Sequence, residues 1–303
     1  MLTMPPPSSE ESVVAPDGVT LHVERFLPDG GVRPVGVLVF VHGFSAHIGN
    51  FRHVGAACAA AGLATTLFDC RGHGRSQGRR GHVNRFSDFI SDLDLIVTGA
   101  RALHPGLPLG LAGHSHGGLI CLEYLLGPAN RVAAQAAPAN ALAVRCLALA
   151  APFLRLRMKI PIFKRALAGP LGRIWPTLAL PNGVKGADVS RTAEAQEGFY
   201  SDPLVHHVAT SRWFNEVRAA QAHAMAAAPA LRTPTLVLVA GQDRLVSNEA
   251  ILAFAAAAGK GADPAAMADV RVYDNLFHEM FLEPERDQVI AALVAWTTAR
   301  ITA

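Results

Sequence analysis

Cysteine is scarce in this 303-residue chain, and no two of its four cysteines form a C-x-x-C motif. Spacings this wide argue against a zinc cluster and against a dense disulfide framework. We therefore expect reduced, mostly buried thiols in a cytoplasmic protein. The four residues are Cys58, Cys70, Cys121 and Cys146.

Targeting signals, long apolar runs and a strong charge bias are also missing. Residues 1–14 lack the basic start and the apolar run of a secretory signal. The longest mid-chain stretch without Asp, Glu, Lys or Arg, Ala102–Leu122, contains three histidines and two prolines, which predicts strand, turn and helix and not a membrane span. The net charge of +3 is too small to indicate nucleic-acid binding.

Short apolar runs alternate with longer Ala- and Leu-rich stretches along most of the chain. This alternation predicts an α/β fold with a mostly parallel central sheet and helices on both faces. The expected strands are 21–27, 35–41, 64–69, 108–112, 144–149, 235–239 and 270–273, and the expected helices are 51–61, 86–103, 117–126, 248–257 and 285–300.

The alternation breaks after residue 151, where prolines interrupt short apolar pieces, and it resumes at Thr235. We expect an inserted helical cap at 152–216, between core segments 1–151 and 217–303. The charge here is lopsided, because no acidic residue occurs between Glu123 and Asp188 while nine arginines and lysines do. Two interpretations stay open: a solvated basic face, or an apolar and basic lid that touches a lipid interface or an anionic substrate.

The strongest functional signal is Gly113-His114-Ser115-His116-Gly117-Gly118, which follows one apolar run and precedes a helical one. G-x-S-x-G between a strand and a helix is typical of a nucleophile elbow, in which the serine occupies a strained turn. The glycines let neighbouring backbones approach the turn. The sequence therefore predicts Ser115 as the nucleophile.

A serine nucleophile needs a positioned base, and in this fold the order along the chain is Ser, Asp or Glu, then His. Asp243 follows the strand expected at 235–239, and His278 follows the last expected strand. We predict that His278 is the general base and that Asp243 orients it. Asp274 competes for the role of Asp243, although it lies only four residues before His278.

The oxyanion formed by attack on an ester carbonyl needs backbone N–H donors. One donor is expected from the residue after the nucleophile, His116, and the other from the loop after an earlier strand. Val37–Val41 runs into His42-Gly43-Phe44, so we predict the Phe44 N–H as the second donor.

The remaining histidines do not have metal-binding spacings. His278-Glu279 lacks the second histidine of H-E-x-x-H, and His22, His206 and His207 have no ligand-spaced partners. The turn at Gly72-His73-Gly74 lacks the lysine of a phosphate-binding loop, so we expect it to support the floor of the site.

These motifs together resemble the α/β-hydrolase superfamily and, within it, the monoacylglycerol lipase and lysophospholipase group. The resemblance runs from about Pro16 to the C-terminus. Its matching segments are His42–His47, Asp69–Ser76, Gly113–Gly118, Ser190-Arg191, Tyr200–Leu204, Gly241–Leu245 and His278. It implies an α/β-hydrolase fold whose cap shields an acyl channel, and a serine esterase or lipase acting on single-chain acyl esters without metal or organic cofactor.

Three positions depart from the group's pattern. The group often has an acidic residue where Ala46 stands and an arginine where Asn50 stands, and it commonly has methionine where His116 stands. The resemblance places Ala46 and Asn50 near the alcohol-binding side of the site. These two departures therefore concern selectivity for the alcohol and not the hydrolytic machinery.

Three alternatives to a lipase stay open at this stage. A short-chain carboxylesterase or an acyltransferase would need the same three residues, and a binding or receptor protein can share the fold. The expected partner is a small acyl ester, with transient contact of the cap with lipid and no nucleic acid. The sequence leaves the oligomeric state open.

Overall fold

A computed structural model describes residues 4–127, 143–157, 172–260 and 268–303. Its core is an eight-stranded sheet in the order β1-β2-β4-β3-β5-β6-β9-β10. Neighbours from β4 to β10 run parallel, whereas β1–β2 and β2–β4 are antiparallel. The mostly parallel sheet is therefore confirmed. Its strands are β1 (Ser9–Val14), β2 (Thr20–Phe26), β3 (Gly36–Val41), β4 (Leu63–Phe68), β5 (Leu109–His114), β6 (Val144–Ala150), β9 (Thr235–Ala240) and β10 (Asp269–Tyr273).

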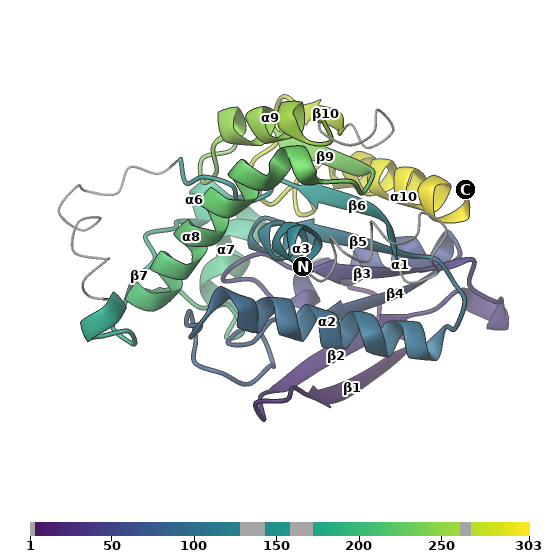
Figure 1. The fold of residues 1–303 in the computed structure, drawn as a ribbon, viewed down its shortest axis with the longest axis horizontal. Coiled ribbons are helices and arrows are strands. Elements are labelled where there is room, and N and C mark those ends of the chain that lie inside the picture. The colour runs from purple at the N-terminus through teal and green to yellow at the C-terminus, as the bar shows by residue number, and fades with distance from the viewer. Residues whose placement is uncertain (1–3, 128–142, 158–171, 261–267) are drawn as a thin grey trace.

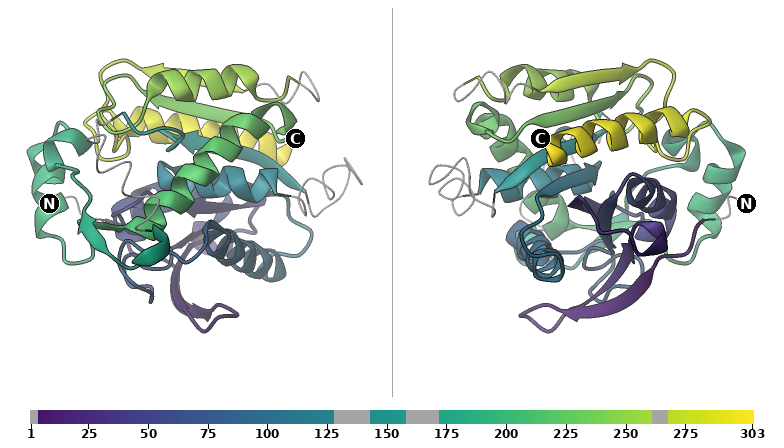
Figure 2. Two further views of the ribbon diagram at one scale, coloured as in Figure 1. Left: turned by 60° about the vertical axis from the view of Figure 1, so that its left-hand side comes forward. Right: turned by 90° about the vertical axis from the view of Figure 1, so that its right-hand side faces the viewer.

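Helices cover both faces of this sheet, as the apolar strand sequences require. Every residue of β3, β4, β5 and β9 is buried, which explains why their sequences are mainly apolar. Helices α1 and α10 lie together on one face, and α2, α3 and α8 lie on the other (Figure 1; Figure 2, right). The core helices are α1 (Arg52–Ala60), α2 (Phe86–Leu103), α3 (His116–Leu126), α9 (Asn248–Ala257) and α10 (Arg286–Thr302), with a 3₁₀ turn η2 (Ile48–Phe51) before α1.

The edges of the sheet are where the sequence is least informative. Strand β1 is not expected from its sequence, because five of its six residues are exposed and carry no apolar alternation. Strand β10 is the opposite edge, and its Val270 and Val272 are exposed to solvent. Among the described helices, none combines the length and the hydropathy that a membrane span would need.

The chain between β6 and β9 departs from the core pattern. Its described part contains a short antiparallel pair, β7 (Ala179–Pro181) and β8 (Val208–Thr210), which forms a separate sheet. It also contains α6 (Gly186–Val189), α7 (Ala193–Ser201) and α8 (Ser211–Ala227). The expected boundary after residue 216 falls inside α8. Helices α6 and α7 lie beside one end of the sheet (Figure 1).

Helix α3 packs very closely against the end of β3. A Cβ atom on Gly117 would lie 2.1 Å from the Val41 carbonyl oxygen and 2.6 Å from that of His42. These are backbone atoms of the central sheet, so they cannot turn aside as a side chain can. Glycine at 117 therefore fixes how near the first turn of α3 comes to the strands.

We predict that Gly117→Ala lowers the free energy of unfolding by about 1–3 kcal/mol, because the added methyl group overpacks this contact. Gly99→Ala is the matched control, since Gly99 lies within α2 with no atom within 4 Å of a new Cβ. It is expected to raise stability by about 0.5–1 kcal/mol. Urea unfolding of both variants checks the prediction, and equal effects would contradict it.

Candidate active site

Four of the predicted site residues follow strands of the parallel sheet. Ser115 follows β5, Asp243 follows β9, His278 lies beyond β10, and Phe44 lies beyond β3. Because parallel strands end at one edge, these residues meet there although they are widely separated in sequence.

The side chains of Ser115, His278 and Asp243 form a continuous hydrogen-bonded chain. His278 Nε2 lies 2.8 Å from Ser115 Oγ, and His278 Nδ1 lies 2.7 Å from Asp243 Oδ2. All three residues are buried. This is the geometry in which a histidine can remove a serine proton while a carboxylate holds its ring.

Asp243 is held for this contact by its own loop. Its second oxygen, Oδ1, accepts hydrogen bonds from the backbone N–H groups of Leu245 and Val246, at 2.8 and 2.9 Å. Asp274, the competing carboxylate, is exposed, and its contacts with the loop of Asp243 run through its backbone carbonyl. The geometry therefore favours Asp243 as the partner of His278.

The electrostatics of His278 favour its protonated form. Burial lowers the pKa of an imidazole, but here the charge and hydrogen bond of Asp243 and the nearby Glu279 outweigh burial, so the pKa of His278 is raised. An imidazolium formed during proton transfer is therefore stabilised at this position.

Two backbone N–H groups are free to bind an oxyanion. Neither the Phe44 N–H nor the His116 N–H donates a hydrogen bond to any residue that the structure describes. The Phe44 loop is held from below by the turn after β4, because Asp69 Oδ1 accepts from the Ile48 N–H at 2.8 Å and the Cys70 N–H donates to His42 Nε2 at 2.9 Å. The turn that contains His73 thus supports the loop, as expected.

Ser115 and His278 lie in the wall of a cavity of about 1080 Å³. The lining comes from the core loops and from the insertion between β6 and β9, and much of it is apolar. Apolar contributors from the insertion include Phe153, Leu180, Phe199 and Phe214. Ala46 and Asn50 also line this cavity, beside His47.

The two histidines that flank Ser115 serve different surroundings. His114 Nε2 donates to the His278 carbonyl at 3.0 Å, so it fixes the backbone of the proposed base. His116 packs instead among Phe44, Phe89 and Trp213. Burial lowers the pKa of His116 to about 3, so its ring is neutral at ordinary pH.

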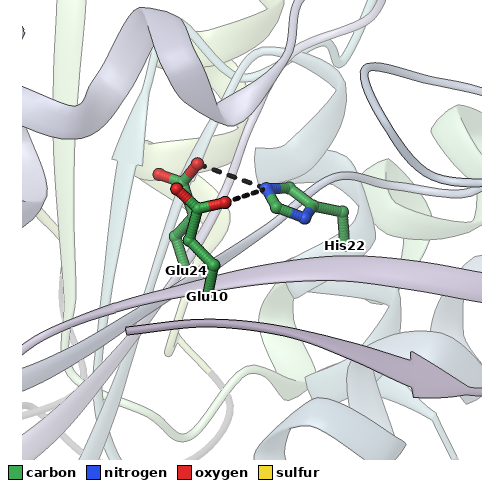
Figure 3. Close-up of side chains that lie close together, drawn as sticks. All are labelled: Glu10, His22 and Glu24. Carbon is green, nitrogen blue, oxygen red and sulfur yellow. Dashed lines mark hydrogen bonds and ion pairs between the residues drawn. The ribbon is translucent and has the colours of Figure 1, made fainter. Parts of the chain in front are cut away.

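One group of described residues has the spacing of metal ligands: Glu10, His22 and Glu24, on β1 and β2 (Figure 3). Both oxygens of Glu24 already accept hydrogen bonds from Arg52, and Arg75 lies 3.2 Å from Glu10. Positive charge at this cluster is therefore supplied by arginine, and we assign no metal to it.

Several contacts that shape the site carry no sequence signal. Asn182 of the insertion donates to Ser45 Oγ at 3.0 Å, and Asp202 accepts from His47 Nε2 at 2.9 Å. These partners are 137 and 155 residues apart. The segment Tyr200–Leu204 matched the family pattern, but no spacing rule connects Asp202 with His47.

We predict that kcat/KM for ester hydrolysis falls at acid pH with a midpoint above about 6.5, the ordinary pKa of histidine. The raised pKa of His278 means that a higher pH is needed to generate the neutral base. A pH profile on a dissolved ester measures the midpoint. A midpoint well below 6.5 would contradict the assignment of His278.

Comparison with known proteins agrees with this geometry. Residues 32–285 match the family described as serine aminopeptidase, S33. The chain is 31% identical to a monoacylglycerol lipase of Mycolicibacterium smegmatis over 97% of this chain and 98% of that protein. It is 29% identical to phospholipase YtpA of Bacillus subtilis over 88% of this chain and 96% of the relative. The crystal structure of a monoacylglycerol lipase from Paleococcus ferrophilus superimposes with a TM-score of 0.79, at 26% identity, covering 92% of this chain and 99% of that one. The chain therefore belongs to the serine aminopeptidase S33 family of α/β-hydrolases, and it is a serine hydrolase of the monoacylglycerol lipase type.

Proposed function

We propose that this enzyme hydrolyses single-chain acyl esters, of the monoacylglycerol or lysophospholipid kind, through an acyl-enzyme on Ser115. One observation carries the proposal: the Ser115 hydroxyl, 2.8 Å from His278 Nε2, faces a large cavity with much apolar lining. Apolar lining stabilises an acyl chain by removing it from water, at about 0.8 kcal/mol for each CH₂ group. The relatives named above support the same substrate class.

In the proposed reaction, Ser115 Oγ attacks the ester carbonyl carbon while its proton moves to His278 Nε2. The carbonyl oxygen becomes an oxyanion that accepts hydrogen bonds from the Phe44 and His116 N–H groups. Breakage of the carbon–oxygen bond releases the alcohol, which takes the proton from His278. Water then repeats the sequence on the acyl-enzyme and releases the fatty acid, and Asp243 stabilises the imidazolium in both halves.

The central test compares wild type with Ser115→Ala on mono-oleoylglycerol and on p-nitrophenyl butyrate. We predict that the variant folds normally and loses about a thousandfold or more of its turnover, because no nucleophile remains. Release of glycerol and of nitrophenol is measured. Turnover near wild type in Ser115→Ala would contradict the mechanism.

Further readouts separate the alternatives to a lipase. Hydrolysis of the butyrate alone would indicate a short-chain esterase, and transfer to an added alcohol would indicate an acyltransferase. Failure to react with either ester or with a serine-directed fluorophosphonate would favour a binding protein. An amino-acid p-nitroanilide checks the peptidase activity that the family description names.

We also propose transient contact of the insertion with a lipid surface. Its described part exposes Ile174 and Trp175, which are 83% and 58% accessible, next to the exposed cation of Arg173. Apolar side chains flanked by cations suit the boundary of an anionic membrane. Several of the nine basic residues, at 131, 159, 164 and 165, lie outside the described residues.

A cytoplasmic location is likewise proposed, and the four buried, unpaired cysteines support it.

We predict that Ile174→Ser with Trp175→Ser lowers hydrolysis of mono-oleoylglycerol presented in anionic vesicles by about tenfold, because less apolar area enters the lipid. Turnover of dissolved p-nitrophenyl butyrate should stay within twofold of wild type. Leu252→Ser is the control, because Leu252 is an exposed apolar residue on α9, outside the insertion. Equal losses on both substrates would contradict lipid contact.

A further inference from the structure

Glu283 lies in the same loop as His278, between β10 and α10, and its carboxylate binds this loop to the insertion. Glu283 is fully buried, and Ser190 Oγ and the Arg191 N–H donate to its Oε1 at 2.6 and 2.7 Å. Its Oε2 accepts from Arg191 Nε and, at 3.4 Å, from the Phe277 N–H. One acidic side chain therefore binds residues that are more than 80 positions apart.

The backbone on both sides of His278 is tied, directly or through Glu283, to the insertion. Before His278, the Phe277 N–H donates to Glu283, six residues further along the same loop, and Glu283 in turn binds Ser190 and Arg191. After His278, the Glu279 N–H donates to the Val189 carbonyl at 3.0 Å. Val189 directly precedes Ser190, so both ties reach the same short piece of the insertion. The orientation of His278 toward Ser115 and Asp243 thus depends on how the insertion sits on the core.

Glu283 is charged in this setting. Burial alone raises the pKa of a carboxyl, but the hydrogen bonds from Ser190, Arg191 and Phe277 outweigh burial and lower the pKa of Glu283. A carboxylate accepts on both oxygens, which suits a site where four donors converge. A glutamine cannot match them, because its amide nitrogen would face donors on one side.

We propose that Glu283 is a positioning residue, which holds His278 in its productive orientation by anchoring the loop between β10 and α10 to Ser190 and Arg191 of the insertion. The role is distinct from contact with substrate, since Glu283 does not line the cavity as Glu279 does. The inference rests on the proposed function, in that it takes His278 to be the base. It does not depend on which ester is the natural substrate.

The test is Glu283→Gln, measured on p-nitrophenyl acetate and on mono-oleoylglycerol. A misplaced base lowers the chemical step, so kcat should fall about 10- to 100-fold on both substrates while KM for the acetate changes little. The acid limb of the kcat/KM profile should also move to lower pH, because His278 would lose part of its contact with Asp243. A residue with a merely structural role would not move this limb.

Glu285→Gln is the matched control. The Glu285 side chain pairs with the same Arg191 guanidinium but, unlike Glu283, accepts no described hydrogen bond from the backbone beside His278. Its kcat and pH profile should stay within twofold of wild type. If Glu283→Gln fails to fold, Ser190→Ala keeps the Glu283 carboxylate and removes one of its anchors, and kcat on the acetate should fall about three- to tenfold.

An unchanged kcat and pH midpoint in Glu283→Gln, or in Ser190→Ala where that variant replaces it, would overturn the proposal. A rise in KM for mono-oleoylglycerol alone would also overturn it, because Glu283 would then anchor only the acyl-binding insertion. The outcome that would contradict the proposed function is a different one. If wild type hydrolyses the acetate and not mono-oleoylglycerol, the lipid substrate is wrong, and the acetate data still decide the role of Glu283.

Discussion

Backbone crowding at the turn after β5 is the constraint on which the rest of the site depends. Ser115 adopts φ 52° and ψ −115°, a conformation that costs a non-glycine residue roughly 1–3 kcal/mol. The turn is held by the Ser115 N–H, which donates to the Ala150 carbonyl at 2.9 Å, and by the Ser115 carbonyl, which accepts from the Phe153 N–H at 3.0 Å. The neighbouring strand β6 thus imposes the strain that presents Oγ to His278.

The three side chains that meet at this turn could be predicted from the sequence. A parallel sheet brings the ends of its strands to one edge, so Ser115, Asp243 and His278 could be chosen from their places after apolar runs. The buried strands were recognisable as well, since burial on both faces favours mainly apolar residues. Strand β1 was not recognisable, because an exposed edge strand does not need apolar residues.

The contacts that join the insertion to the core could not be predicted. Arg244, which directly follows Asp243 in the sequence, shows why. Its side chain donates to the Ala187 carbonyl at 3.1 Å and lies 4.2 Å from the centre of the Phe277 ring, and Phe277 directly precedes His278. The sequence around Arg244 predicts the acidic residue of the site, but it does not predict which groups the exposed arginine side chain contacts. Contacts of this kind depend on how irregular segments fold, and the spacing of apolar residues does not predict that.

Ala46 and Asn50, the two positions where the resemblance implies charged side chains in the group, are both neutral in this chain. Both residues line the cavity, where a charge is only partly hydrated. An unpaired charge in a buried wall costs several kcal/mol, so neutral side chains at both positions need no compensating partner. The two neutral side chains stand beside His47, whose Nε2 lies 2.9 Å from Asp202, and Arg52 and Glu279 line the same cavity. At positions 46 and 50 the cavity wall therefore offers no fixed charge to a polar head group, so any recognition by these two residues depends on shape and on the neutral hydrogen bonds of Asn50.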